Sequence, residues 1–319
     1  MIRAVWHRAA PGALALWLVV GGAPAPLVAQ SGAPALVARC SGGDAGLAPA
    51  CGDAVLGAMG LGLGSSLLMS GGAVVPVPPN TLGRRVPQGG PRASLSLRLL
   101  AATVSTVRMG EGAQPAAPLE ETGWGFRAAV AAGVFDGLRP IPSVGGLFSL
   151  DLFATVDHLG VASAAVREGG WAWGGGARLG LLRESFTTPG VAVDLATSRT
   201  GKLRLQSGAT DPVTVGVRAH SLRVSVGKDL LGVGAVGGVG RDWSRMDVEL
   251  QLPGAQPAQG SIDTSRDVAF LGATLNYLVA QLSAEVGWAG GINPPGVPST
   301  IINPSRERLF GSFAVRLIY

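Results

Sequence analysis

The end of the chain, residues 308–319, alternates strictly between two faces. One face is apolar and consists of Leu309, Gly311, Phe313, Val315, Leu317 and Tyr319. The other face carries Arg308, Ser312 and Arg316. A period of two is typical of a β-strand that separates two environments. Because arginines stand opposite a lipid-like face, we expect one side to meet hydrocarbon and the other a polar interior.

The composition restricts how such strands can be used. Apolar residues make up 47% of the chain and charged residues only 14%, with a mean hydropathy of +0.37, whereas about a quarter of the residues in a soluble domain are charged. Beyond residue 30 no uninterrupted apolar run is long enough for a spanning helix. Lipid cannot pair backbone N–H and C=O groups, so a closed barrel is the remaining membrane structure.

The ending resembles the final strand of bacterial outer-membrane β-barrel proteins, in which a terminal aromatic residue and alternating apolar residues form an assembly signal. The resemblance implies that Phe313, Val315, Leu317 and Tyr319 form this signal and that the barrel-assembly machinery recognises it. It also implies a location in the bacterial outer membrane, with outer-membrane lipid as a partner. The ending does not distinguish one member of this class from another.

The predicted fold class is all-β, a transmembrane antiparallel up-and-down β-barrel. Alternating segments from Arg92 onward give about ten strands, joined by short periplasmic turns and long external loops in turn. The polar stretches 198–212 and 243–266 are assigned to external loops. Residues 54–69 alternate as well and would make the count odd. They either lie in the lumen or periplasm, or pair with a strand within 71–88 in a barrel of about twelve strands.

Three regions are predicted: a signal peptide at 1–29, a periplasmic lead-in at 30–56 and the barrel at 57–319. Residues 1–29 combine early arginines, a short apolar stretch and a small-residue cleavage site. Cys40 and Cys51 follow closely, and in an oxidising periplasm we expect them to form a structural disulfide. Two thiols without a nearby histidine are too few for a metal site, and no metal or cofactor is predicted.

The polar faces of the predicted strands define a lumen. The residues assigned to it are Arg98, Arg127, Asp151, Asp157, Arg178, Asp194, Arg218, Arg223, Glu285 and Arg316. Within 213–226 the apolar residues change from odd to even positions, which predicts a β-bulge near His220. The charged groups have two interpretations. They form a cross-strand ladder that fills a narrow barrel, or their arginine surplus favours anions in an open pore.

Aromatic residues near the ends of the segments predict a girdle at the level of the lipid headgroups. They are Trp124, Trp171, Trp173, Trp243, Trp288 and Tyr319. The net charge of +5 is spread singly along the strands, so no nucleic-acid partner is predicted.

The predicted function is that of a non-enzymatic barrel, either a narrow pore for small solutes, including anions, or a structural or surface-interaction barrel. The alternative is a barrel hydrolase, a protease or lipid-modifying enzyme with a site near the external rim. Such a site needs a histidine beside an acid or a serine. His158 and His220 are the candidates, and Asp157 with His220 is the one conceivable dyad. No catalytic residue is assigned.

Overall fold

The computed structural model describes residues 32–73, 80–83, 92–108, 117–138, 146–161, 169–207, 210–291 and 306–319. The predicted signal peptide, residues 1–29, lies outside these ranges.

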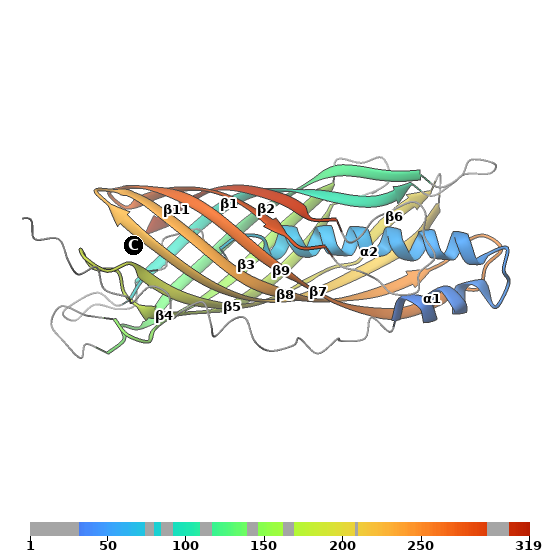
Figure 1. Ribbon diagram of the computed structural model, residues 1–319, viewed down its shortest axis with the longest axis horizontal. Helices are drawn as coiled ribbons and strands as arrows, with labels where there is room; N and C mark the ends of the chain where they lie inside the picture. The colour runs from blue at the N-terminus through green and yellow to red at the C-terminus, as the bar shows by residue number, and fades with distance from the viewer. Residues whose placement is uncertain are drawn as a thin grey trace, which may run out of the picture.

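Antiparallel strands account for most of the described chain (Figure 1). Their bounds are β1 (Ala93–Arg108), β2 (Ala117–Phe135), β3 (Ser149–Val161), β4 (Gly170–Leu182), β5 (Gly190–Thr200), β6 (Leu203–Ser207), β7 (Thr210–Leu230), β8 (Val233–Leu250), β9 (Ala258–Tyr277), β10 (Ala280–Ala289) and β11 (Arg308–Ile318).

The strands close into a barrel. Sequential neighbours pair from β1 to β5 and from β7 to β11, and two further pairings, β1 with β11 and β5 with β7, complete the circle. The short strand β6 pairs with β7 beyond the end of β5, so β5 and β6 act as one strand that is interrupted at Gly201 and Lys202. The result is a closed antiparallel barrel of ten strands. The predicted fold class and strand count are confirmed, and the alternative of twelve strands is wrong.

The two ends of the barrel differ. The chain enters β1 and leaves β11 at the same end, where Ser94 lies opposite Ile318. The tight turns at Leu231–Gly232 and Leu278–Val279 lie at this end too. We call it the inner end, because short turns face the periplasm in barrels of this class. The opposite end is the outer end.

The strands are much longer than a membrane requires. β7 has 21 residues and β9 has 20, whereas a tilted transmembrane strand needs about 9–11. The predicted loop at 243–266 is wrong, because β8 continues to Leu250 and β9 begins at Ala258. The predicted loop at 198–212 is also mostly strand. The barrel therefore extends well beyond the membrane at its outer end.

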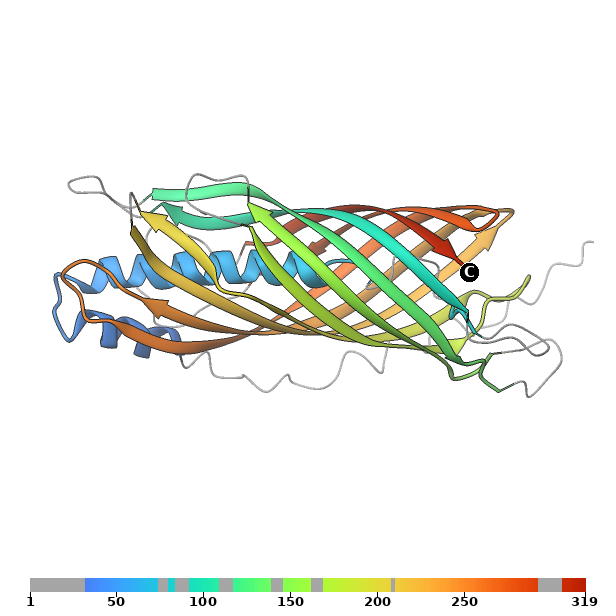
Figure 2. The ribbon, with the colours of Figure 1, turned by 180° about the vertical axis from the view of Figure 1, so that it is seen from behind.

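Two helices precede the strands, α1 (Gly32–Ser41) and α2 (Ala48–Ser70). Figures 1 and 2 agree that α2 lies inside the barrel, running from the outer end to about the middle. It runs antiparallel to β1, since Gly57 faces Val107 and Gly72 faces Arg98. α2 continues through residue 56, the predicted boundary between the lead-in and the barrel. α1 and the start of α2 lie at the outer end of the barrel.

The segment 54–69 is a helix although its apolar residues alternate. Glycines occupy the positions between Met59, Leu61 and Leu63, and on a helix a spacing of two distributes side chains around the whole circumference. A helix that is apolar on every side is a buried one. α2 is long and apolar enough to span a membrane by composition, but 94% of its most apolar window is buried within the structure. Of the predicted alternatives for this segment, the lumen is the observed one.

Candidate functional site: the plugged lumen

The inner face of the barrel wall changes from apolar at the outer end to charged near the middle, and the outer face changes in the opposite sense. β7 shows this within one strand: Val213, Val215 and Val217 point inward at the outer end, and Arg223 points inward near the middle. The pairings of β7 with β5 and β8 have no register shift, so the predicted bulge is wrong. The wall changes its chemistry while its backbone stays regular.

Arg218 is the lumen assignment that the structure contradicts. Its side chain is 64% exposed on the outer surface and faces Asp247 at 3.6 Å. The physical reason is the reversal of polarity along the wall. Beyond the hydrocarbon layer the outer surface meets lipid headgroups and water while the interior meets an apolar helix, so an outward arginine and inward valines are both favourable.

The outer half of the lumen is an apolar core shared by α2 and the wall. Inward residues of β6 to β9, including Leu205, Met246 and Ile262, are fully buried and belong to the same hydrophobic cluster as α2. The approach is closest at glycines. A Cβ on Gly60 would overlap the backbone carbonyl of Ser105 in β1, and one on Gly62 would overlap the Met246 side chain. The glycines thus make α2 thin enough for a ten-stranded barrel.

Arginines from the wall bind the carboxyl-terminal part of α2. Arg223 donates to the Ser70 carbonyl at 2.9 Å, Arg127 to the Met69 carbonyl, and Arg266 to the Leu63 carbonyl at 2.9 Å. Arg98 donates to the Ala73 carbonyl, just beyond the helix, at 2.5 Å. We refer to Arg98, Arg127, Arg223 and Arg266 as the arginine cluster. A helix leaves its last carbonyls unpaired and carries a partial negative charge there. Arg127 and Arg223 donate to two of these carbonyls, those of Met69 and Ser70, and the cluster places positive charge near the helix end.

Each member of the arginine cluster also pairs with a buried carboxylate. Arg98 lies 2.6 Å from Glu285, and Arg127 lies 2.6 Å from Asp157. Asp242 serves two arginines, with Arg223 at 2.6 Å and Arg266 at 3.3 Å. Asp242 also accepts a hydrogen bond from the Ser70 hydroxyl of α2 at 2.7 Å. Buried charges are tolerated when they are paired and hydrogen-bonded in this way.

A second group of polar residues fills the inner end. Arg178 binds Asp194 through two contacts of 2.7 and 3.0 Å. The described segment 80–83 is buried against the inner face of the wall. There the Leu82 N–H donates to Asp151 at 2.7 Å, and the Thr81 hydroxyl donates to the Ser149 hydroxyl at 2.6 Å. Polar groups at the inner end of the lumen therefore bind segment 80–83.

The remaining lumen assignments are placed as follows. Apart from Arg218, all of them are buried side chains of the wall, and Arg316 is 4% exposed near Asp151 and Arg178 at the inner end. They form two groups. Arg98, Arg127 and Arg223 bind α2 or the residue just beyond it, whereas Asp151 binds segment 80–83. The ladder interpretation describes their pairing but omits the helix carbonyls that these arginines also bind.

Neither Asp242 nor Arg266 is among the predicted lumen residues. The predicted loop at 243–266 contains Arg266 and begins directly after Asp242. A signal was present. Residues 243–250 alternate, with Arg245 and Asp247 on one face and Met246 and Val248 on the other. This period of two is that of a strand, but the polar side chains of the strand face outward rather than into the lumen.

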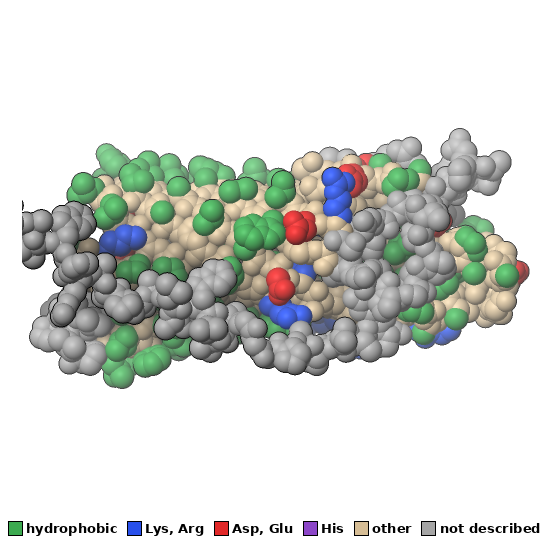
Figure 3. All heavy atoms as spheres, in the orientation of Figure 1, with side chains coloured by type: hydrophobic (Ala, Val, Ile, Leu, Met, Phe, Trp, Pro, Cys, Tyr) green, Lys and Arg blue, Asp and Glu red, His purple; other side chains and the backbone are tan. Residues whose placement is uncertain are grey.

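The outer surface of the inner half is an apolar belt. Figure 3 shows hydrophobic side chains over the half of the barrel that holds the carboxyl terminus, with Asp, Glu, Lys and Arg near the middle. Exposed belt residues include Leu99 (55%) and Leu271 (65%). The residues predicted to form the girdle are all exposed, as are Phe313 and Tyr319 of the predicted assembly signal.

The two described histidines lie on the outer face. His158 is half-buried between Trp124 and Trp171, with ring centroids 5.4 and 4.9 Å away. His220 is exposed. Asp157 points inward and binds Arg127, so Asp157 and His220 occupy opposite faces of the wall and cannot form the dyad considered above.

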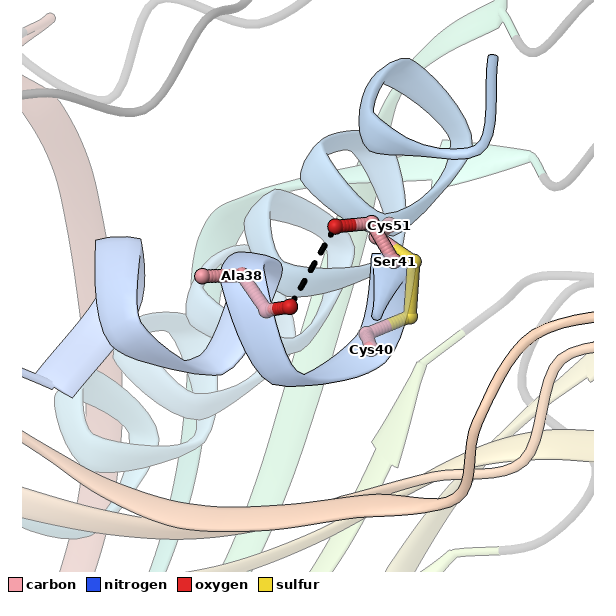
Figure 4. The surroundings of a disulfide bond; sticks show 4 residues. All are labelled: Ala38, Cys40, Ser41 and Cys51. Atoms are coloured by element: carbon pink, nitrogen blue, oxygen red, sulfur yellow. Dashed lines mark hydrogen bonds between the residues drawn. A yellow bond between two sulfur atoms is a disulfide. The ribbon is translucent and has the colours of Figure 1, made fainter. Parts of the chain in front are cut away.

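A disulfide joins the helices at the outer end. Cys40 near the end of α1 is bonded to Cys51 in the first turn of α2, as predicted (Figure 4). The Cys40 carbonyl accepts a hydrogen bond from the Gln256 N–H, 3.0 Å away in the β8–β9 connection. α1 is thus attached to both the plug and the rim of the barrel.

The closed wall, the apolar belt and the buried charges together define the class of protein. It is a membrane-spanning antiparallel β-barrel, the class found in bacterial outer membranes, and its lumen is filled by a helix of the same chain. The predicted localisation in the bacterial outer membrane agrees with this surface.

Comparisons with known proteins show a similarity of architecture alone. No protein-family model matches the chain, and no curated protein matches it. Similar solved structures include the translocator domain of the autotransporter NalP from Neisseria meningitidis, with 12% identity, coverage of 73% of this chain and 89% of that chain, and a TM-score of 0.40. The outer-membrane protease OmpT from Escherichia coli has 9% identity, coverage of 72% and 96%, and a TM-score of 0.35. The Pseudomonas putida toluene transporter TodX has 11% identity, coverage of 80% and 93%, and a TM-score of 0.29. At these scores, the similarities do not indicate what this chain does.

Proposed function

We propose that this protein is a plugged, non-conducting barrel that anchors its own amino-terminal helices at the cell surface. It belongs to the structural or surface-interaction branch of the predicted functions. The observation that carries the proposal is the arginine cluster, because it fixes the carboxyl end of α2 to several strands at once.

The packing of α2 supports a permanent plug rather than a removable one. Gly60 lies against backbone of β1, which cannot yield as a side chain can. The wall around α2 is also apolar, with Leu205, Val215 and Met246 fully buried. Withdrawing α2 would expose this wall to water at about 25 cal/mol per Å² of apolar surface. It would also remove the acceptors of the arginine cluster.

The same contacts weigh against the narrow anion pore. A surplus of arginines favours anions only if the guanidinium groups are free to meet them. Those of the arginine cluster already bind carboxylates and helix carbonyls. A conducting state would need α2 and segment 80–83 to leave together. The outward position of His158 and His220 gives no support to the hydrolase alternative.

The path of the chain supports surface display. β1 begins at the inner end, yet α1 and the start of α2 lie at the outer end. The chain therefore passes along the lumen before it enters the wall. The turn between the helices is exposed at Gly43 and Asp44, where an external partner could reach it.

Planar-bilayer recording of the purified full-length protein tests the plug. We expect no steady current at any polarity. A stable, anion-selective current from the wild-type protein would overturn the proposal and restore the pore.

Epitope insertion tests the orientation independently. An epitope placed after Asp44 should bind antibody on intact cells. The matched control carries the same epitope after Phe186, which is 95% exposed in the β4–β5 turn at the inner end. It should bind only after the outer membrane is permeabilised. The reverse pattern would place α1 in the periplasm and overturn surface display.

A further inference from the structure

The outer surface of the barrel contains a groove that the plug does not use. Its volume is about 480 Å³, and it is lined by Trp173, Arg199, Lys202, Arg218, Asp247 and Glu249, among others. We propose that this groove binds the phosphate group of an outer-leaflet lipid headgroup. The proposal concerns the outer face and does not depend on whether the lumen is closed.

The groove arises from the interruption between β5 and β6. The ladder with β7 ends at the pair Arg199 and Arg218 and resumes at Leu203 and Val215. Between these pairs Gly216 has no atom within 4 Å of the position of an added Cβ, which leaves the floor open. The interruption thus produces a depression in an otherwise continuous wall.

The groove lies where the apolar belt gives way to charge. On β5, Leu195 is 56% exposed and belongs to the belt. Arg199 is the second outward-facing residue after Leu195 in the direction of the outer end. Trp173 on the adjacent strand is 46% exposed and belongs to the aromatic girdle. Girdles of this kind lie at the headgroup level. A lipid with its phosphate in the groove would therefore place an acyl chain beside Leu195.

The chemistry of the lining suits a phosphate. Arginine guanidinium groups bind phosphate oxygens through paired N–H donors. Arg199 is already oriented, because its guanidinium carbon lies 4.6 Å from the centroid of the Trp173 ring. Three cations face two carboxylates, so the lining has a net positive charge.

The cations of the groove are available to a ligand, because their present ion pairs are weak. Lys202 lies 2.8 Å from Glu249 and Arg218 lies 3.6 Å from Asp247, with side chains that are 63% and 64% exposed. Exposed pairs of this kind contribute little to stability. A phosphate carrying more charge can therefore displace the carboxylates.

The test is native mass spectrometry of the full-length protein in detergent, titrated with diphosphorylated lipid A. Removing a cation near an anionic lipid costs about 1 kcal/mol, or about fivefold in affinity. The Arg199→Gln/Arg218→Gln variant should therefore bind lipid A about 25-fold more weakly. The matched control is Arg306→Gln, which removes an exposed arginine at the outer rim that pairs with Glu120 at 2.7 Å. It should change the affinity less than about twofold.

Three outcomes would overturn the proposal. They are an unchanged affinity in the double variant, an equal loss in the Arg306 control, and full displacement of lipid A by an equal concentration of inorganic phosphate, which would show a site for the free ion. A heat-dependent shift in gel mobility identical to that of the wild type shows that each variant is folded. Lys202→Gln provides a second, milder variant, with an expected loss of about fivefold.

Discussion

At the scale of single residues, the function of a charged side chain follows from what occupies the lumen opposite it. Arg223 and Arg218 are five residues apart on β7. The first is fully buried and binds the Ser70 carbonyl of α2, whereas the second is exposed to solvent. The carboxylate of Asp242 connects the buried arginines to one another and to α2. The loss of this wall carboxylate should therefore weaken the attachment of α2.

Replacing Asp242 by asparagine should destabilise the barrel by about 3–5 kcal/mol, because Arg223 and Arg266 would both lose their buried counter-charge. The midpoint of urea-induced unfolding in detergent measures this. The control is Asp247→Asn on the same strand, where an exposed carboxylate pairs weakly. Its effect should stay within about 0.5 kcal/mol. Equal losses in both variants would contradict the role of the arginine cluster.

Replacing Gly60 by alanine tests whether α2 packs against β1, because a packed helix and a free helix predict opposite changes in stability. In a free helix, Gly→Ala stabilises by about 1 kcal/mol. In α2 the new Cβ would overlap the Ser105 carbonyl, so we expect Gly60→Ala to destabilise by about 1–3 kcal/mol. Gly57→Ala is the control, since its Cβ would meet the flexible end of Leu205 at 3.3 Å. Unfolding of both variants in detergent decides the matter, and stabilisation by Gly60→Ala would show that α2 is not held against β1.

At the scale of elements, the strands of the outer half have an apolar inner face and a charged outer face. β8 carries Arg245 and Asp247 outward while Met246 and Val248 pack inward. This arrangement depends on α2, because only an apolar partner inside makes inward valines and methionines favourable. α1 is attached to α2 by the disulfide and also packs its buried Leu36 and Val37 in the same hydrophobic core.

Replacing Cys40 and Cys51 by serine should loosen the connection between α1 and α2 without unfolding the barrel, because α1 keeps its buried contacts in the core. Opening a disulfide over a separation of 11 residues costs about 2–3 kcal/mol, and the loss should be local because α2 keeps its own contacts. Protease added to intact cells should cleave near residues 42–47 faster in the variant. The gel-mobility shift of the barrel should remain unchanged, and a loss of that shift would contradict a local role.

At the scale of the whole molecule, the barrel has two functionally different halves. The inner half has the surface of a membrane protein, with an apolar belt and aromatic side chains at its borders. The outer half has the surface of a soluble protein and an apolar core. α2 packs inside the outer half, and its carboxyl end is bound by arginines of the wall near the middle, so the two halves form one folding unit.

Nitroxide labels should locate the boundary between these halves. A label at Leu99 or Leu271 should be accessible to oxygen dissolved in the bilayer, because both side chains are exposed in the belt. A label at Asp247 or Asp263 should instead be accessible to a water-soluble nickel chelate. Power-saturation measurements in reconstituted vesicles provide the comparison. An oxygen-accessible label at Asp247 would mean that the membrane covers more of the barrel than we infer.

The alternation of side chains predicted a barrel of about ten strands, with twelve as the alternative, because the period of two is a local property of each strand. The terminal aromatic face and the scarcity of charge indicated the membrane for the same reason. The pairing of Cys40 with Cys51 also followed from their closeness in the chain and their expected compartment. These conclusions required no knowledge of what lies inside the barrel.

In the outer half of the barrel, the tertiary structure alone decided which face of each strand points inward, and it did so through α2. A period of two does not distinguish the inner from the outer face, since both choices alternate equally well. Near Arg218 and Arg245 the choice depends on a glycine-rich helix that is distant in sequence and is brought into the lumen by the path of the chain. The free energy of burying that helix, rather than any preference of the strand itself, turns the valines inward and the arginines out.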